Sequence, residues 1–387
     1  MITNILLTDM KHYFLLFILL LVIITIEGCT EELHPETNGT NSPVLNEGEL
    51  TKAVLDLSVN TFAVEAQAET RASIPSNIPE NETSEEKEVH NIWVFQYDAV
   101  TKELLIKPRY YTITDQIMLQ DLPVYLKAGI PSFVYVVTNT GYDNWVNDDR
   151  DTSWQKFKNL EQLKKQTLPT AFPLRSIDKV SIPMVGASEE VEVTTGITVT
   201  VPVTRMYAKL KVKVEMLKAE MKLNNVNVRQ IPNICRIETF AGDGNGEPMN
   251  AVPFPDGTTF SSIAFAASDL EKSEDKEWAV FYVPENLQGE IENQGGNKSD
   301  AAPTNALVVD VTAEIGGEKY LYAAYPGGNS LNNFNIQRNQ VYRMTLTITG
   351  EKGQNNPSSN CFVVKPNGFL SFEPYYRCLL YTSPSPR

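Results

Sequence analysis

Histidine is scarce in this chain, with three residues among 387, at His12, His34 and His90. His12 lies in an apolar leader and His34 in the polar segment after it, so the folded body holds only His90. A catalytic triad built on histidine or a histidine-rich zinc site therefore has almost no material here. We expect His90 to be an ordinary surface residue.

Basic residues are also in deficit. The chain has 33 Lys and Arg against 48 Asp and Glu, a formal net charge of -15. This balance opposes binding to nucleic acid or to anionic lipid headgroups. A glycine-rich phosphate loop, a nucleophile elbow and metal-ligand spacing are missing from the sequence as well. We therefore predict no enzyme activity, no catalytic residue, no metal and no cofactor, and we favour a binding or structural role.

A hydrophobic leader opens the chain. The apolar run Tyr13–Ile26 is too short for a comfortable membrane span and suits the core of a signal peptide, with Lys11 as its positive front and Met10 as an alternative start. It ends at Glu27-Gly28-Cys29, which resembles a bacterial lipoprotein signal despite the glutamate. We predict a signal peptide over residues 1–28 and lipidation of Cys29; an ordinary secretory peptide or a short anchor is the alternative. Residues 29–50 are polar and are predicted to be a flexible tether.

The last ten residues have an unusual sequence. Cys378–Arg387, CLLYTSPSPR, resembles the translation of a sequencing adapter. We expect residues 378–387 to be a non-native tail; a genuine Pro/Ser-rich tail is the alternative. Cys235 and Cys361 then remain beside Cys29, and they could pair in an export compartment or stay independent.

Short apolar runs separated by Gly, Asn and Pro turns fill the body of the chain, and this pattern predicts an all-β fold with the strand spacing of sandwiches. Repeated crossover helices, which a parallel sheet would need, are missing from the pattern. Two runs flank Gly316-Gly317 and predict a hairpin. Asn159–Leu168 has helical spacing and predicts one short helix. The clearest strand predictions are Asn91–Tyr97, Phe133–Thr138, Tyr207–Met216, Trp278–Val283, Ala306–Glu314, Lys319–Tyr325 and Val341–Thr349.

We divide the body near Arg205. The predicted domains are residues 51–205 and 206–350, each a β-sandwich, with the short helix in the first. Residues 351–377 are predicted to be a linker and the start of a further domain that this sequence does not finish.

Two acidic stretches could suggest chemistry. Asp243 opens a Gly-rich loop with oxygen ligands, but the loop lacks the glutamate of a 12-residue calcium loop, and a plain turn is favoured. Asp148, Asp149 and Asp151 lie near Trp145 and Trp154, a combination that occurs in glycosidases. Because these residues occupy one short segment, we favour a solvated loop.

The stretch Thr51–Ala72 is the feature around which the functional interpretation is built. Its apolar residues largely alternate, as in a half-buried strand. Thr70-Arg71-Ala72 and a polar loop, residues 73–89, follow the strand. A strand joined to the body through one arginine in a flexible segment can be cut and removed. The alternating residues are Val54, Leu55, Leu57, Val59, Phe62 and Val64.

Several segments in order resemble the fimbrillins of Bacteroidales, the lipoprotein subunits of type V pili. They are Thr70–Ala72, Asn91–Asp98, Pro108–Tyr111, Pro183–Gly186 and, most strongly, Asn333–Tyr342. The resemblance covers residues 29–350. It implies two transthyretin-like β-sandwich domains, cleavage by an arginine-specific protease between Arg71 and Ala72, and replacement of the first strand by a donor strand from another subunit.

The resemblance also implies partners and a place. The partners would be other fimbrial subunits, the arginine-specific protease and, before processing, the outer membrane through a lipid anchor, with no nucleic acid. The place would be the cell surface and the fimbrium. Ser359–Pro374 resembles the start of a further domain in longer members, which favours a tip or minor subunit that supports adhesion. The alternative is a cell-surface glycan-binding β-sandwich lipoprotein with Trp145 and Trp154 as a sugar platform.

Overall fold

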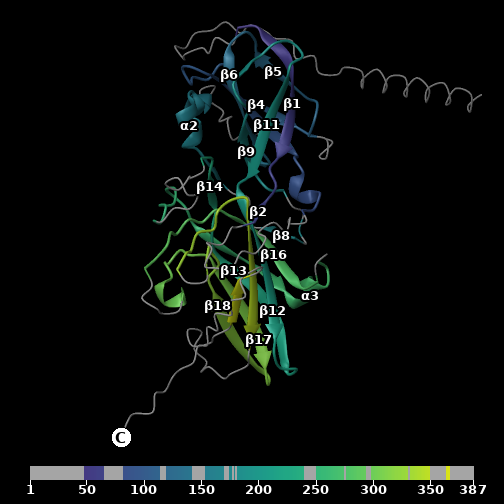
Figure 1. The fold of residues 1–387 in the computed structure, drawn as a ribbon, viewed down its shortest axis with the longest axis vertical. Helices are drawn as coiled ribbons and strands as arrows, with labels where there is room; N and C mark the ends of the chain where they lie inside the picture. The colour runs from purple at the N-terminus through teal and green to yellow at the C-terminus, as the bar shows by residue number, and fades with distance from the viewer. Residues whose placement is uncertain are drawn as a thin grey trace, which may run out of the picture. The chain divides into compact units, whose positions relative to one another are not determined.

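The computed structural model describes residues 48–64, 82–113, 119–141, 153–169, 174–176, 178, 181–238, 250–273, 276–292, 298–329, 332–348 and 363–366. These residues form mainly strands, so the all-β prediction is confirmed (Figure 1). In the described part of the chain, no helix has the length and apolar character needed to cross a bilayer. Among the described residues, the helices are α2 (Leu160–Lys164), α3 (Ala267–Leu270) and the 3-10 turns at Glu85–Lys87, Ser153–Phe157 and Lys298–Ala301.

The first sheet contains eight strands in the order β4-β3-β6-β9-β11-β1-β5, with β10 paired to β6. Val, Ile, Leu and aromatic residues dominate these strands, as expected for pleated segments that bury one face. The strands are β1 (Leu50–Val59), β3 (Asn91–Asp98), β4 (Arg109–Thr112), β5 (Leu122–Lys127), β6 (Pro131–Thr138), β9 (Met184–Ala187), β10 (Val191–Glu192) and β11 (Thr198–Arg205).

This sheet curves so that its two ends face each other. One buried cluster takes side chains from β1, β3, β5, β6 and β11. The carboxamide of Gln96 in β3 both donates to the carbonyl of Lys127 in β5, at 2.9 Å, and accepts from its N–H, at 2.7 Å. The curved sheet therefore forms both layers around the first core.

The second and third sheets pack on each other. A single buried cluster joins side chains of β12, β16 and β19 to those of β13, β17 and β18, which is the core of a sandwich. The second sheet holds β2 (Ala63–Val64), β8 (Leu174–Arg175), β12 (Tyr207–Met216), β16 (Trp278–Pro284), β19 (Gln340–Ile348) and β20 (Val363–Pro366). The third holds β13 (Met221–Pro232), β15 (Phe260–Ala266), β17 (Val308–Ile315) and β18 (Glu318–Ala324).

Two local predictions are confirmed. The strands β17 and β18 form an antiparallel hairpin, and Gly316 and Gly317 adopt φ of 62° and 87° between them, values that other residues reach only at a steric cost. The short helix is α2, and the side chain of Asn159 caps its first turn by accepting from the N–H of Gln162 at 2.9 Å.

Strands change sheet near Arg205: β11 ends in the first sheet at that residue, and β12 starts in the second sheet at Tyr207. The two halves are also linked by pairing, because β2, β7 (Thr167–Pro169) and β8 pair with β19, β14 (Ile234–Arg236) and β16. The division of the chain into domains at this point stays a prediction.

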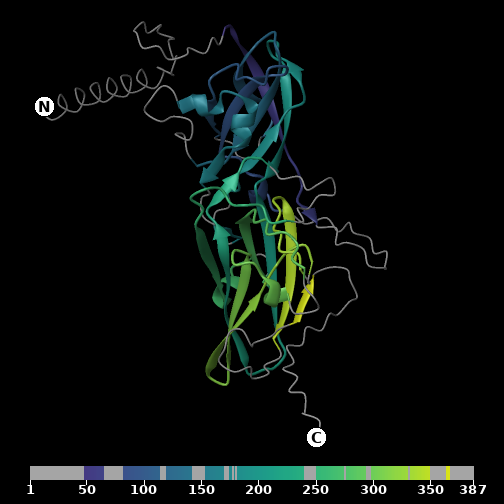
Figure 2. The ribbon, with the colours of Figure 1, turned by 90° about the vertical axis from the view of Figure 1, so that its left-hand side faces the viewer.

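Part of the stretch predicted to begin a further domain lies in the second sheet, and the further domain itself stays a prediction. Val363–Pro366 forms β20, which pairs antiparallel with Met344–Thr347 of β19 (Figure 2). Because β12 occupies the opposite edge of β19, β2 and β20 share the remaining edge.

Candidate functional site

Strand β1 occupies an internal place in the first sheet. It runs parallel to β11, with Val54–Val59 opposite Thr198–Val203, and antiparallel to β5, with Leu50–Leu55 opposite Leu122–Lys127. Among the described strands, β5 pairs with β1 alone. Removal of β1 would therefore expose one edge of β11 and detach β5 from its ladder.

The inward face of β1 is apolar. Ala53, Leu55 and Leu57 are buried in the first core, and Val59 packs against it. Val54 alternates with them and is half-buried. The strand thus fills the core as well as the hydrogen-bond ladder, and its vacancy would be an apolar groove with two unpaired edges.

After β1 the chain passes to the second sheet. Phe62 is buried in a different cluster, with Tyr207, Tyr282 and Val341 among its neighbours. Ala63 and Val64 form β2, parallel to Gln340 and Val341 of β19. One segment, residues 50–64, therefore completes two sheets.

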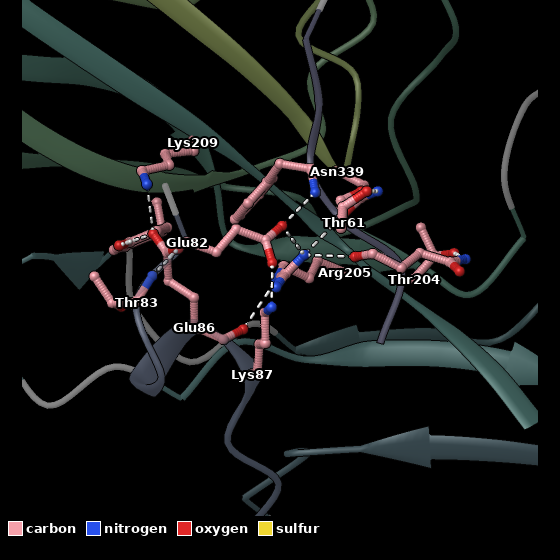
Figure 3. Close-up of polar contacts among 12 residues, drawn as sticks. Thr61, Glu82, Thr83, Glu86, Lys87, Thr204, Arg205, Lys209 and Asn339 are labelled. Atoms are coloured by element: carbon pink, nitrogen blue, oxygen red, sulfur yellow. Dashed lines mark hydrogen bonds and ion pairs between the residues drawn. The ribbon is translucent and has the colours of Figure 1, made fainter. Parts of the chain in front are cut away.

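Three side chains hold the turn between β1 and β2; we call Arg205, Glu82 and Asn339 the Arg205 cluster (Figure 3). The Nη1 of Arg205 donates to the carbonyl of Asn60 at 2.7 Å. The Nδ2 of Asn339 donates to the carbonyl of Thr61 at 2.8 Å, and the N–H of Phe62 donates to Oε1 of Glu82 at 2.5 Å. Three consecutive residues are thus held through their main chain.

The side chain of Arg205 is fully buried. Its guanidinium carbon lies 4.1 Å from the centre of the Phe62 ring, the geometry of a cation–π contact. Nε donates to the carbonyl of Glu86 at 2.9 Å, and Nη1 lies 3.4 Å from Oε1 of Glu82 and 3.3 Å from Oδ1 of Asn339. A buried cation costs several kcal/mol unless such partners surround it, so Arg205 depends on the turn that it holds.

Charge in the cluster is balanced by the segment that follows residue 81. Burial alone would raise the pKa of Glu82, but the hydrogen bond from Phe62, the contact with Lys87 at 2.9 Å and the charge of Arg205 hold it below its ordinary value. Burial lowers the pKa of Arg205, while Glu82 and Glu86 oppose that shift. The lowered pKa keeps Glu82 ionised at neutral pH, and a guanidinium stays protonated in proteins.

A second buried polar group joins this segment to the other sheet. Oε1 of Glu86 lies 2.7 Å from Nζ of Lys209 in β12 and accepts from the hydroxyl of Tyr282 in β16 at 2.5 Å. The burial of Tyr282 and the negative charge of Glu86 raise the pKa of that phenol. Residues on both sides of the predicted cleavage position, 60–62 and 82–86, thus lie against the same buried arginine.

The predicted modification sites lie outside the described residues: Cys29 for lipidation, and Arg71 with Ala72 for cleavage. Trp145 and the acidic residues near it, and the loop at Asp243, lie outside them too. Trp154 is half-buried and packs against the cluster around Phe62. His90 is half-buried, 3.7 Å from the Glu88 carboxylate.

Two further points concern metal ligands and the cysteines. In the part of the chain that the structure describes, no group of three His, Cys, Asp or Glu side chains could hold a metal ion. Cys235 is a free thiol, and burial raises its pKa to about 12, which makes it unreactive. Its suggested partner Cys361 lies outside the described residues.

Sequence reasoning missed the Arg205 cluster. The sequence pattern marks Arg205 only as a domain boundary and places Glu82 in a loop. A signal was present: Arg205 ends the alternating strand Thr198–Arg205 at a position where the pattern calls for an apolar residue.

Comparison with known proteins finds solved structures that are similar in fold to this chain. A family described as a domain of unknown function, DUF4906, matches residues 281–346, which is less than half of the chain. No curated protein matches. Solved structures that resemble the chain include the tip fimbrial protein Mfa3 from Porphyromonas gingivalis with C-terminal truncation, at 15% identity and a TM-score of 0.46, covering 79% of this chain and 97% of that one.

A fimbrial assembly protein from Parabacteroides distasonis is similar at 13% identity and a TM-score of 0.45, over 82% of this chain and 95% of that one. A further similar structure, from Bacteroides ovatus and described as that of a candidate cell adhesion protein, has 11% identity and a TM-score of 0.39, over 83% and 97%. The chain is thus similar to fimbrial proteins of Bacteroidales, as its sequence resemblance predicts.

Proposed function

We propose that this protein is a structural subunit of a fimbrium, assembled by protease-triggered donor-strand exchange. The observation that carries the proposal is the place of residues 50–64. This segment, which precedes Arg71 in the chain, supplies the internal strand β1 to one sheet and the edge strand β2 to another.

The energetics favour replacement over an empty groove. Leu55, Leu57 and Phe62 are buried, and burying each contributes about 1.5–3 kcal/mol, so the three contribute about 5–9 kcal/mol. That sum is comparable with the whole stability of a typical domain, about 5–15 kcal/mol. A cut subunit that loses the segment would gain most from another extended strand, because such a strand restores both the ladder and the core.

The proposed order of events follows from chain connectivity. Lipidation at Cys29 would hold the subunit at the outer membrane with its first strand in place. Cleavage after Arg71 would separate that strand and the anchor from the body in one step. The subunit would then leave the membrane as it takes a donor strand, which places it in the fimbrium on the cell surface.

A tip or minor position belongs to the same proposal. It rests on the resemblance of Ser359–Pro374 to longer fimbrillin-like proteins and on nothing in the described fold. A subunit at the end of a pilus would be suited to adhesion.

The test uses two proteases and one substitution. Arg71→Lys should resist an arginine-specific protease yet be cut by trypsin, whereas the wild type should be cut by both. Wild-type protein treated with the arginine-specific enzyme should lose residues before Ala72 and then form multimers or bind an extended donor peptide; Arg71→Lys should do so only after trypsin. If the cut wild type unfolds, or stays a monomer that binds no extended peptide, the proposal is wrong.

A further inference from the structure

The Arg205 cluster holds its segment in two different ways. The contacts to Asn60 and Thr61 and the N–H of Phe62 involve main-chain atoms, which any residue can supply. The contact to the Phe62 ring depends on the side chain. The main-chain contacts therefore fix where the strand ends, and the ring contact depends on which side chain occupies position 62.

The Phe62 ring is a weak acceptor beside the buried guanidinium of Arg205. Nη2 of Arg205 is buried and has no hydrogen-bond partner among the described residues. A buried donor without an acceptor is costly, and an aromatic face is a weak acceptor for a guanidinium in a way that an aliphatic side chain is not. The ammonium of Lys209, 5.7 Å from the same ring centre, adds to the preference.

Register is the property that such a contact would control. A strand that slips by one residue turns its apolar side chains to the wrong face. The β1 groove itself recognises alternation, as at Ala53, Leu55 and Leu57, and shifts of two residues would preserve that alternation. An aromatic residue five positions after Leu57 lies over Arg205 in one register only. This contact therefore excludes such shifts.

We propose that the Arg205 cluster is the specificity site for the incoming strand. It selects an extended segment of a partner polypeptide whose alternating apolar run is followed, at the register of Phe62, by an aromatic side chain. This inference rests on the proposed function, since it concerns the strand that replaces residues 50–64. It goes further by naming the chemistry that distinguishes one donor from another.

The experiment measures exchange on the full chain after cleavage at Arg71. Fluorescent peptides spanning residues 48–64 are offered in excess, and binding and dissociation are followed by anisotropy. The series is the native sequence, Phe62→Leu, Phe62→Trp and Ser58→Ala. Leucine keeps apolar bulk and loses the ring, and Ser58 is exposed on the same strand, so its variant is the matched control.

The Phe62→Leu peptide should bind about thirtyfold more weakly than the native peptide, the size expected for a desolvated cation–π contact. Phe62→Trp should bind within about threefold of the native peptide or more tightly, and Ser58→Ala within about twofold. Equal binding of the native and Phe62→Leu peptides would overturn the inference and leave strand exchange standing. If no peptide binds, the proposed function itself is wrong.

A second variant distinguishes the effect of the Arg205 charge from that of side-chain packing. In an Arg205→Met protein, which loses the cation and keeps an unbranched side chain, the preference for phenylalanine over leucine should shrink to about threefold or less. A preference that stays near thirtyfold would show that the ring acts through its volume alone and would contradict the role of Arg205. The peptide series in wild-type protein decides the proposal if this variant does not fold.

Discussion

Replacing Leu55 by alanine tests whether β1 is a structural part of the uncut protein. Leu55 is fully buried in the first core and lies opposite Val199 of β11 and Leu122 of β5. Deleting a buried leucine side chain removes its transfer free energy and leaves a cavity, which costs about 2–5 kcal/mol. For domains of this size that corresponds to a fall in Tm of about 4–20 °C.

The assay is thermal unfolding of the uncut chain, followed by circular dichroism. Ser58→Ala on the same strand is the control, because that side chain is exposed; its effect should stay within about 0.5 kcal/mol. The second arm follows cleavage at Arg71 and removal of the free segment, after which Leu55→Ala and wild type should unfold identically. A loss below about 1 kcal/mol for Leu55→Ala in the uncut chain would refute the argument that β1 fills the core.

Three further outcomes are expected. The pKa of Glu82 is lowered in the folded protein, so its ionised carboxylate stabilises the fold above its ordinary pKa of about 4.3, and this stability is lost as the pH falls through the lowered value. Urea unfolding of Glu82→Gln should therefore show a smaller loss of stability between pH 6 and pH 3 than that of the wild type. Equal losses would contradict this. Gly186→Ala would place a Cβ 2.0 Å from the carbonyl oxygen of Pro202, so it should cost at least about 1–3 kcal/mol by forcing β9 away from β11; an unchanged Tm would show that the strands are not so close. In a variant that keeps Cys235 and has serine at the other three cysteines, iodoacetamide at pH 8 should modify the native thiol more than about a hundredfold more slowly than the denatured one, and rapid labelling of the native protein would be inconsistent with its burial.

The sequence predicted best where a local pattern decides the structure. An apolar run predicts the strand around Trp93, alternation predicts those around Val212 and Met344, two glycines predict the hairpin, and helical spacing over Asn159–Leu168 predicts the short helix. The sequence pattern does not predict strands β5 and β15. Leu122–Lys127 has a proline as its second residue, and Phe260–Ala266 is rich in serine and alanine, which are weak strand formers.

The site was only partly predictable for a different reason. The removable strand could be recognised from its own residues, Leu55 and Leu57 in particular. The Arg205 cluster brings together residues far apart in the chain, such as Glu82, Arg205 and Asn339, and no local pattern encodes that meeting. Likewise, Val363–Pro366 has the composition of a strand, but only the fold shows that it joins β19.

The most direct test of strand replacement is the intact mass of the subunit isolated from assembled fimbriae, together with its N-terminal sequence. The account predicts that the chain in the fibre begins at Ala72, so that β1 and β2 are absent, while the precursor at the membrane begins at a lipidated Cys29. A fibre subunit that retains residues 50–64 would contradict the account.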